Sequence, residues 1–565
     1  MTRTVDEYIR NLSDLKRVRQ PYEALWQDIG NYVLPRRSFW DIEATPGQKP
    51  ETKIYDTTAL FAVQLLVDGI QGNLLSAKLP WLRMVMEDRR LQHLPGVPTY
   101  LEQLQEIFLA EYARTNFYGS LTEFLTDGVS LGTAIMFVED TVAEKTIRFL
   151  PRHLKECYIA EDAGGRVHTV YRHFTMENQQ ALDAWGKNLP RQRRERAEQD
   201  PYSRGHFLHI VEPRRNGRRG GWDAENRSYA EVYLDKDFKE IIDEGGYDEF
   251  PYLVWRWAKL TDEVYGRGPA GDAIYEVLRI NQMAKALLQS AQLANEPPLN
   301  VPERLKGRER IVPRGYNYFT NPQEIVTPIN LGGNYPIGKD QEDQVRDQIK
   351  DLFRTKIFLL MEQLEAGKYT ATEIRERVGE KATVLDPTIA RLSTDVLRPM
   401  VTRTYEILGR NGVLPPPPPA LREGGRVHIE FQGPLAQAQE RYQRSQGVVA
   451  SIPVIDAIVK LNPDSADIVD FDELMRVGME GAGAPQKTIR DMPLVEKLRK
   501  LRADAMALQQ ERQEAMQTEQ MIAANANKLN EPVQPDSMLT GIAKNMARRP
   551  AAKAPARGVL AGERT

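Results

Sequence analysis

The chain has 565 residues, enough for about three or four domains, and its 41% hydrophobic and 27% charged content is typical of a soluble globular protein. A formal net charge of -3 excludes a protein coated in basic charge for gripping nucleic acid. We therefore expect any DNA contact to be local or weak.

The single cysteine, Cys157, excludes an internal disulfide and a cysteine-based zinc or iron–sulfur site. His153 precedes it by four residues, but in a predicted loop, so we expect no catalytic Cys–His pair. No run of about eighteen apolar residues occurs, and the N-terminus has no apolar signal-peptide region. We expect no transmembrane helix and a protein that is made and used without crossing a membrane.

The first part of the chain predicts helices. Apolar residues recur at helical spacing from Asp6 to Val33, and Pro21 is expected to interrupt this helix. Asp56 is a good N-cap for a strongly apolar helix that continues to Leu75. Two further elements are predicted, a strand at Trp81–Met86 and an amphipathic helix at Tyr100–Asp127.

From Thr133 the period changes, and short β-branched and aromatic runs separated by turn residues predict strands. About residues 1–260 should therefore form one α+β domain, helical first and sheet-rich second. The basic run Arg191–Arg196 lies in a polar insertion, where we expect a solvated loop, with nucleic-acid contact as the alternative. The predicted strands are Ala134–Val138, Ile147–Leu150, Val167–Arg172, His206–Val211, Tyr229–Tyr233 and Tyr252–Trp257.

Two long helices are predicted in the middle of the chain. In Ala273–Ala294 apolar residues cover well over half of the circumference, so more than one side needs a partner. In Lys339–Glu365 they follow one face, and seven acids stand against five bases. A channel lined by such a polar face would let DNA slide, because phosphate neutralisation is what makes binding tight. An ordinary solvated helix face is the alternative.

A short loop is predicted after the second long helix. Gly367 breaks the helix, and Thr370 and Glu373 form a capping box that starts another. Ala366–Tyr369 is then held between two helix ends. Between the two long helices, residues 296–338 are rich in proline, glycine and β-branched residues and predict a compact excursion.

The C-terminal part again predicts mostly helix. Asp386–Pro387 starts a helix that is expected to kink at Pro399. One strand follows at Val427–Phe431, and residues 435–527 predict a helical domain. From Leu529 the composition cannot bury a core, so we expect a disordered, mildly basic tail.

No motif supports catalysis. Gly333–Lys339 matches G-x-x-x-x-G-K, but Pro336 removes a backbone donor and Asp340 puts an anion where a phosphate loop needs a hydroxyl. His206 and His209 lie three apart on a predicted strand and should face opposite sides. We expect no enzyme activity, no cofactor and no metal site.

Several local patterns occur in a fixed order along the chain. They are Tyr55-Asp-Thr-Thr58, Trp81, Gly132-Thr-Ala, Arg256-Trp257, Tyr265-Gly-Arg-Gly-Pro269, Glu296-Pro-Pro298, Thr370-Ala-Thr-Glu373 with Arg377, and Leu414-Pro-Pro. In this order they resemble the head-to-tail connecting (portal) proteins of short-tailed, T7-like bacteriophages. The resemblance covers the chain to about residue 525.

The resemblance implies a mostly helical α+β ring subunit, in a ring that is typically dodecameric, with an α/β wing, a two-helix stem, a small α/β clip and a helical crown. The implied parts are the wing at 1–265, stem helices at 266–295 and 339–365, the clip at 296–338, a channel loop at 366–370, the wing return with its kinked helix at 371–432, the crown at 433–528, and an unplaced tail at 529–565.

The resemblance also implies the function, a viral portal at one capsid vertex through which double-stranded DNA is packaged, retained and ejected. Gly367, Lys368 and Tyr369 would then form the channel loop, with Lys368 making transient phosphate contacts. The clip would dock the large terminase and then tail proteins through its basic residues. These are Arg304, Lys306, Arg308, Arg310 and Arg314.

Further partners implied by the resemblance are tail adaptor and tail tube proteins, major capsid and scaffolding proteins, and internal core or ejection proteins, with no membrane. The implied location is the virion, after assembly in the host cytoplasm, and ATP hydrolysis belongs to the terminase. Two alternatives stay open: a nucleotide-driven motor using Gly333–Asp340, and a non-ring scaffold component of a virion.

Overall fold

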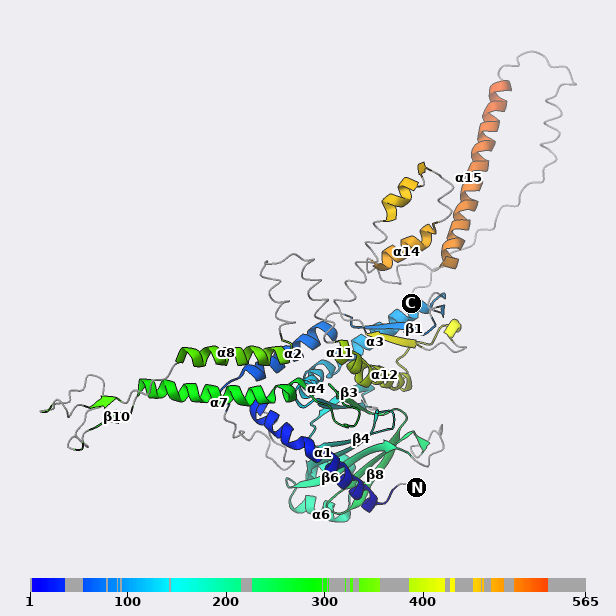
Figure 1. Ribbon diagram of the computed structural model, residues 1–565. Helices are drawn as coiled ribbons and strands as arrows, with labels where there is room; N and C mark the ends of the chain where they lie inside the picture. Colours follow the sequence, from blue (N-terminus) through cyan, green and yellow to red (C-terminus); the bar gives the residue numbers. More distant parts are fainter. Residues whose placement is uncertain are drawn as a thin grey trace, which may run out of the picture. The chain divides into compact units, whose positions relative to one another are not determined.

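The computed structural model describes residues 3–35, 54–77, 80–88, 90–91, 94–141, 144–214, 226–296, 298–301, 303, 321, 326–328, 335–355, 386–421, 427–431, 451–458, 460–461, 469–481 and 492–526. Two compact units divide the chain, Met1–Gln486 and Lys487–Thr565 (Figure 1). The fold is α+β and mostly helical, as predicted. None of the helices in the described ranges is long and apolar enough to span a bilayer.

The first helix, α1 (Val5–Tyr32), runs through Pro21 without a break, so the predicted interruption is wrong. A capping box starts this helix: Thr4 Oγ1 accepts the Glu7 N–H at 3.4 Å, and Glu7 Oε2 accepts the Thr4 N–H at 2.9 Å. Side chains buried on both sides of the proline keep the helix continuous, because their burial outweighs one lost backbone hydrogen bond.

The cap predicted for the second helix is corrected by one residue. Thr57 is the N-cap of α2 (Thr58–Leu74) and makes no side-chain cap hydrogen bond. Asp56 instead accepts the Thr58 N–H through Oδ1 at 2.8 Å. The single helix predicted at Tyr100–Asp127 is two helices, α3 (Val97–Arg114) and α4 (Phe117–Leu131), so that prediction is wrong at Thr115 and Asn116.

Both predicted strands outside the main sheets are confirmed, and they pair with each other. β1 (Leu82–Met86) is antiparallel to β12 (Val427–Phe431), with Leu82 opposite Phe431. This ladder joins segments that are far apart in the sequence.

Two antiparallel sheets form the β part of the first unit, in the orders β3-β2-β9 and β4-β5-β6-β7-β8. The predicted runs lie in strands except for Trp257, which follows the end of β9. No run predicts β4 or β8, since β4 is short and β8 mixes acids with glycines. The strands are β2 (Thr133–Thr141), β3 (Thr146–Arg152), β4 (Cys157–Glu161), β5 (Val167–Glu177), β6 (Arg204–Pro213), β7 (Tyr229–Asp235), β8 (Glu240–Tyr247) and β9 (Tyr252–Arg256).

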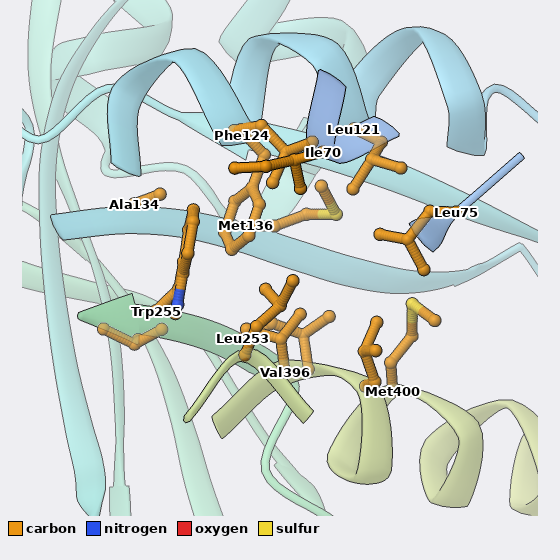
Figure 2. Packing of buried hydrophobic residues seen from close by; sticks show 14 of the residues in the cluster. Ile70, Leu75, Leu121, Phe124, Ala134, Met136, Leu253, Trp255, Val396 and Met400 are labelled. Carbon is orange, nitrogen blue, oxygen red and sulfur yellow. The ribbon is translucent and has the colours of Figure 1, made fainter. Parts of the chain in front are cut away.

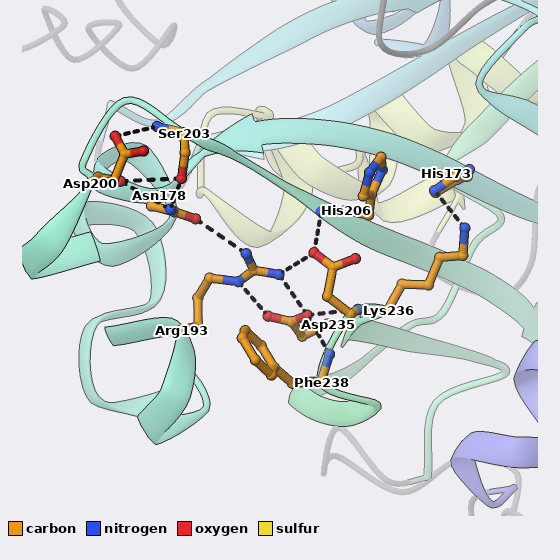
Figure 3. A network of polar contacts seen from close by, with 10 residues as sticks. His173, Asn178, Arg193, Asp200, Ser203, His206, Asp235, Lys236 and Phe238 are labelled. Carbon is orange, nitrogen blue, oxygen red and sulfur yellow. Dashed lines mark hydrogen bonds and ion pairs between the residues drawn. The ribbon is translucent and has the colours of Figure 1, made fainter. Parts of the chain in front are cut away.

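The basic run is not the expected solvated loop. It forms α6 (Arg191–Gln199), which follows α5 (Asn178–Trp185) and a 3₁₀ turn at Gly186–Asn188. Arg193 is fully buried, and its guanidinium donates to both carboxylate oxygens of Asp235 at 2.7 and 2.9 Å (Figure 3). This buried pair holds α6 on the sheet, because a buried charge needs a partner.

The long central helices are α7 (Pro269–Asn295) and α8 (Tyr335–Leu352). Regular helix ends at Leu352, so the prediction that α8 runs unbroken to Glu365 is wrong at residues 353–355, and residues 356–365 lie outside the described part of the chain. The short strands β10 (Leu299–Asn300) and β11 (Thr327–Pro328) pair antiparallel in the sequence between the two helices.

The irregularity predicted at Pro399 takes the form of a π-helical segment, Ser393–Leu397, between α11 (Asp386–Leu392) and α12 (Arg398–Arg410). In a regular helix the Pro399 ring would clash with the carbonyl four residues earlier, and the wider π turn lies at that point. The remaining elements are a 3₁₀ turn at Pro419–Leu421, α14 (Phe471–Gly481) and, in the second unit, α15 (Met492–Ala526).

The main core lies where these helices meet the three-stranded sheet. Figure 2 shows Ile70 of α2, Phe124 of α4, Met136 of β2, Trp255 of β9 and Met400 of α12 packed together, and all five are buried. Burying each large side chain stabilises the fold by about 1.5–3 kcal/mol. This core fixes the base from which α7 and α8 extend.

Candidate functional site: the paired helices α7 and α8

Three glycines whose backbones touch fix the start of α7. Gly132, at the end of α4, has a φ of +79°, and a Cβ there would lie 2.5 Å from backbone atoms of Gly266, Arg267 and Gly268. Thr133 Oγ1 accepts the Gly266 N–H at 2.9 Å. Only glycine fits so close an approach, so these segments form one rigid glycine junction.

Beyond the glycine junction the two halves of α7 differ. The first half faces the core, and Ala270, Ala273 and Val277 are each at most 1% exposed. In the second half, from Gln282 to Asn295, only the stripe toward α8 is half-buried. The helix therefore extends from the core with one side covered by α8.

A polar joint of Asp56, Asn281, Glu342 and Arg346 ties α7 and α8 to the start of α2. Arg346 donates to Asp56 Oδ2 at 3.0 Å and to Glu342 Oε1 at 2.8 Å. Asn281 Oδ1 accepts the Asp56 N–H at 3.3 Å. Burial opposes the Arg346 charge, but hydrogen bonds to Asp56 and Asp343 outweigh it and raise the pKa of Arg346. The Arg346 guanidinium therefore stays charged at any physiological pH.

The exposed side of the second half of α7 is nearly uncharged. Lys285 is the one charged residue from Gln282 to Asn295. Leu288 and Leu293 are 49% and 41% exposed. A helix face in contact with water ordinarily carries charged residues, so this side is typical of one that meets a protein partner.

The exposed side of α8 is acidic. Asp340, Asp343, Asp347 and Asp351 are exposed and follow one another at steps of three or four, which places them on one face. Val345 and Ile349, with the opposite phase, are buried. Asp343 forms an ion pair with Arg346 at 2.9 Å, and Asp347 forms one with Lys350 at 3.2 Å. With four aspartates and these two bases, the net charge of this face is moderately negative.

The residues predicted as channel loop and docking site lie outside the described part of the chain. These are Gly367, Lys368 and Tyr369, and Arg304, Lys306, Arg308, Arg310 and Arg314. The structure therefore describes the helices next to them in sequence, and the functional assignments of these residues stay predictions.

The phosphate-loop match has the wrong local structure. α8 begins at Tyr335, so Pro336, Gly338 and Lys339 lie inside the helix. N–H groups beyond the first turn donate to carbonyls within the helix. Those of the first turn point along the helix axis and do not curl around a phosphate as a glycine-rich loop does. The match does not indicate a nucleotide site.

Cys157 is not a nucleophile in this fold. It is fully buried at the start of β4, and burial raises the pKa of its thiol to about 12. The protonated thiol is unreactive at neutral pH. His206 and His209 face opposite sides of β6, as predicted, and within the described ranges no group of histidine, cysteine and acidic side chains could hold a metal ion.

One buried polar network was missed from the sequence. The ring of His209 bonds Glu231 Oε1 through Nε2 at 3.0 Å and the Tyr252 hydroxyl through Nδ1 at 2.7 Å. Glu231 and Tyr252 lie 22 and 43 positions after His209 in the sequence, so no local pattern could have indicated these contacts. His209 is 2% exposed, so this network braces the two sheets rather than meeting a substrate.

The polar joint was also missed, because Asp56 and Arg346 are 290 positions apart. The sequence did contain one signal, since Asp56 lies in the Tyr55-Asp-Thr-Thr58 pattern. That pattern predicts a helix cap, whereas its carboxylate both supports α2 and binds Arg346.

Comparison with known proteins places this geometry in context. A family model described as bacteriophage head to tail connecting protein matches residues 5–489. The portal protein of Salmonella phage epsilon15 is 27% identical over 558 residues, covering 95% of this chain and 98% of that protein. A probable portal protein of Bordetella phage BPP-1 is 27% identical over 505 residues, covering 87% of this chain and 89% of that protein.

A solved structure titled "Neck of empty GTA particle computed with C6 symmetry" contains a chain that aligns with this one. The alignment covers 70% of this chain and 86% of the chain in that structure. The sequence identity of that match is 12% and its TM-score is 0.35.

Proposed function

Because the chain belongs to the bacteriophage head to tail connecting protein family, it is a head-to-tail connector of a phage virion, and we propose that it works as a closed ring around a DNA channel. The ring, in which twelve copies are expected from the resemblance, passes double-stranded DNA during packaging, retains it, and releases it on ejection. The capsid lies on one side of this ring and the tail on the other.

The nearly uncharged exposed side of α7 is the observation that carries this proposal. A ring joins two different patches of the same subunit, so each copy needs an apolar surface that a second copy covers. Leu288 and Leu293 point about 140° apart on α7, so each would be covered by a different neighbouring copy, on a helix that the glycine junction and the polar joint hold in place. The acidic side of α8 then faces the channel, where it disfavours tight phosphate binding.

The proposal is tested by native mass spectrometry and negative-stain averages of the full chain and of the double variant Leu288→Glu, Leu293→Glu. We expect closed rings from the unaltered chain and smaller species from the variant, because buried carboxylates disfavour an apolar contact. Tyr202→Glu is the control, since Tyr202 is 78% exposed on a different segment. Rings of unchanged size in the double variant would rule out this contact.

The remaining parts follow the resemblance and are proposals of the same kind. In these terms α7 and the part of α8 from Lys339 onward belong to the stem, residues 296–338 to the clip, 366–370 to the channel loop and 433–528 to the crown. The arginines and lysine of the clip dock terminase and then tail proteins. Lys368 holds packaged DNA through transient phosphate contacts, and unchanged DNA retention in Lys368→Ala rings would disprove that role.

A nucleotide-driven motor is the weaker candidate, because α8 begins inside the Gly333–Lys339 match. A thermal melt with and without ATP and magnesium separates the two functions. We expect no shift of the melting temperature, and a saturable rise would favour the motor.

A further inference from the structure

The C-terminal end of α8 is a Schellman cap built on an arginine. The Arg354 N–H donates to the Asp351 carbonyl at 2.9 Å, and the Thr355 N–H donates to the Lys350 carbonyl at 3.0 Å. Arg354 has a φ of +55°, in the left-handed region. Glycine is the usual residue there, because a Cβ makes that conformation unfavourable.

The local sequence favours a helix that continues past this cap. No glycine or proline occurs from Val345 to Glu365, and the apolar spacing crosses the cap unbroken. It runs through Val345, Ile349, Leu352, Phe353, Ile357, Leu360 and Leu364. Nothing in the residue types explains why the regular helix ends at Leu352.

Tertiary contacts explain the end of the helix instead. Phe353 and Thr355 are 0% and 1% exposed, although residues two apart on a helix point about 200° away from each other. The left-handed residue between them lets both side chains face the core. The Thr355 hydroxyl adds a further hydrogen bond to the Lys350 carbonyl at 3.0 Å.

Two effects therefore oppose each other at one residue. The cap gains burial of Thr355 and its hydrogen bonds, whereas the continued helix avoids the left-handed arginine and gains regular hydrogen bonds. A balance of this kind lets a small change of contacts decide where the helix ends.

We propose that the end of α8 is a two-state helix stop, capped at Leu352 in one state and continued as helix through Arg354 in the other. The stop is a property of the single chain and goes beyond ring formation. In a connector it changes the length of the helix that precedes the predicted loop Ala366–Tyr369.

The test uses the full chain with spin labels at Gln341→Cys and Gln363→Cys, diluted into excess unlabelled chain, and pulsed electron–electron distance measurements. Cys157 is buried and does not compete for the label. A continued helix puts the labelled positions about 33 Å apart along its axis. We expect this distance and a second one in the unaltered chain.

Substitutions at Arg354 should then change the ratio of the two populations. Arg354→Gly should favour the capped state by roughly 5- to 30-fold, because glycine adopts the left-handed region without strain. Arg354→Val should favour the 33 Å population, since β-branched residues are the least tolerant of that region. Arg354→Ala keeps a Cβ and removes the side-chain interactions of Arg354, including that with Asp272, so the glycine ratio is compared with the alanine ratio.

Either of two results would overturn the proposal. One distance that stays the same in all four proteins means that α8 has a single fixed end. Equal effects of alanine and glycine mean that lost contacts of the arginine side chain, and not its backbone conformation, set the equilibrium. Ring formation does not enter either readout, so this test and that of the proposed function can fail separately.

Discussion

Two buried histidines of the five-stranded sheet are held in the neutral form. The Nε2 atom of His173 accepts a hydrogen bond from the Lys236 ammonium at 3.2 Å (Figure 3). Burial, and then Lys236 and Lys16, lower the pKa of His173 to about 3. Burial likewise lowers the pKa of His209, although Glu231 opposes that shift. Protonation of either ring would put an extra cation inside the fold.

We expect the free energy of unfolding to fall on acidification. A histidine whose folded pKa is lowered contributes stability that is complete above its unfolded pKa near 6.5 and is lost as the pH falls toward the folded value. For His173 the loss at about pH 5 is roughly 2 kcal/mol. Urea unfolding of the unaltered chain between about pH 7.5 and 5 measures it, and His173→Gln should show the smaller pH dependence.

His168→Gln is the matched control for this measurement, since the His168 ring is half-buried on the same strand and bonds the Ala160 carbonyl. It shows how much of any change comes from replacing a histidine on this strand and how much from removing the buried His173. If His173→Gln and the unaltered chain lose stability in parallel, the sensitivity to acid comes from other groups.

At the scale of elements, the polar joint links α8 to the start of α2 through the Arg346–Asp56 ion pair. Asp56 and Glu342 are 7% and 8% exposed, so removing Arg346 leaves two buried carboxylates without their cation. Breaking such a pair is more costly than its net contribution to folding, because the remaining charge has lost its hydration.

A double-mutant cycle on Arg346→Gln and Asp56→Asn checks the joint. We expect each single variant to lower the free energy of unfolding by about 2 kcal/mol and the double variant to lose less than their sum. Arg279→Gln on α7 is the control, since its pair with Glu276 is exposed and contributes little. Strict additivity of the two losses would mean that the ion pair does not couple these helices.

The sequence predicted the elements whose pattern is local. The strands from Ala134 to Trp257 and the helix α7 carry their own alternating or helical spacing, and they form as predicted. Pro21 and the end of α8 were predicted wrongly, because packing by distant side chains overrode the local preference. The polar joint and the buried Arg193 pair depend on partners 290 and 42 positions away, and no spacing signals such contacts.

At the scale of the whole molecule, the second unit buries little in its described residues. Side chains of α15 from Leu501 to Met521 are all exposed, so within the described residues this helix buries almost nothing. Helices of this length obtain most of their stability from packing, which indicates that α15 becomes fully stable only when something covers it.

We therefore expect a chain that ends at Gln486 to keep the stability of the first unit. Its free energy of unfolding should change by less than about 0.5 kcal/mol, because the described side chains of α15 are almost all exposed. Tryptophan fluorescence in urea is the measurement, since all seven tryptophans precede Gln486. A large loss would show that the second unit supports the first.

The β1–β12 ladder also bears on how the chain is synthesised. β1 ends at Met86 and its partner begins at Val427, a difference of 341 positions, and Trp81 stacks on Phe431 at 6.4 Å. At translation rates of 5–20 residues per second, β1 waits roughly 20 to 70 s on the ribosome before its partner strand has been made. During that time a hydrophobic strand has an unpaired edge, which chaperones can bind and which other nascent chains can join. The yield of folded subunits should therefore depend on the speed of translation over the last part of the first unit.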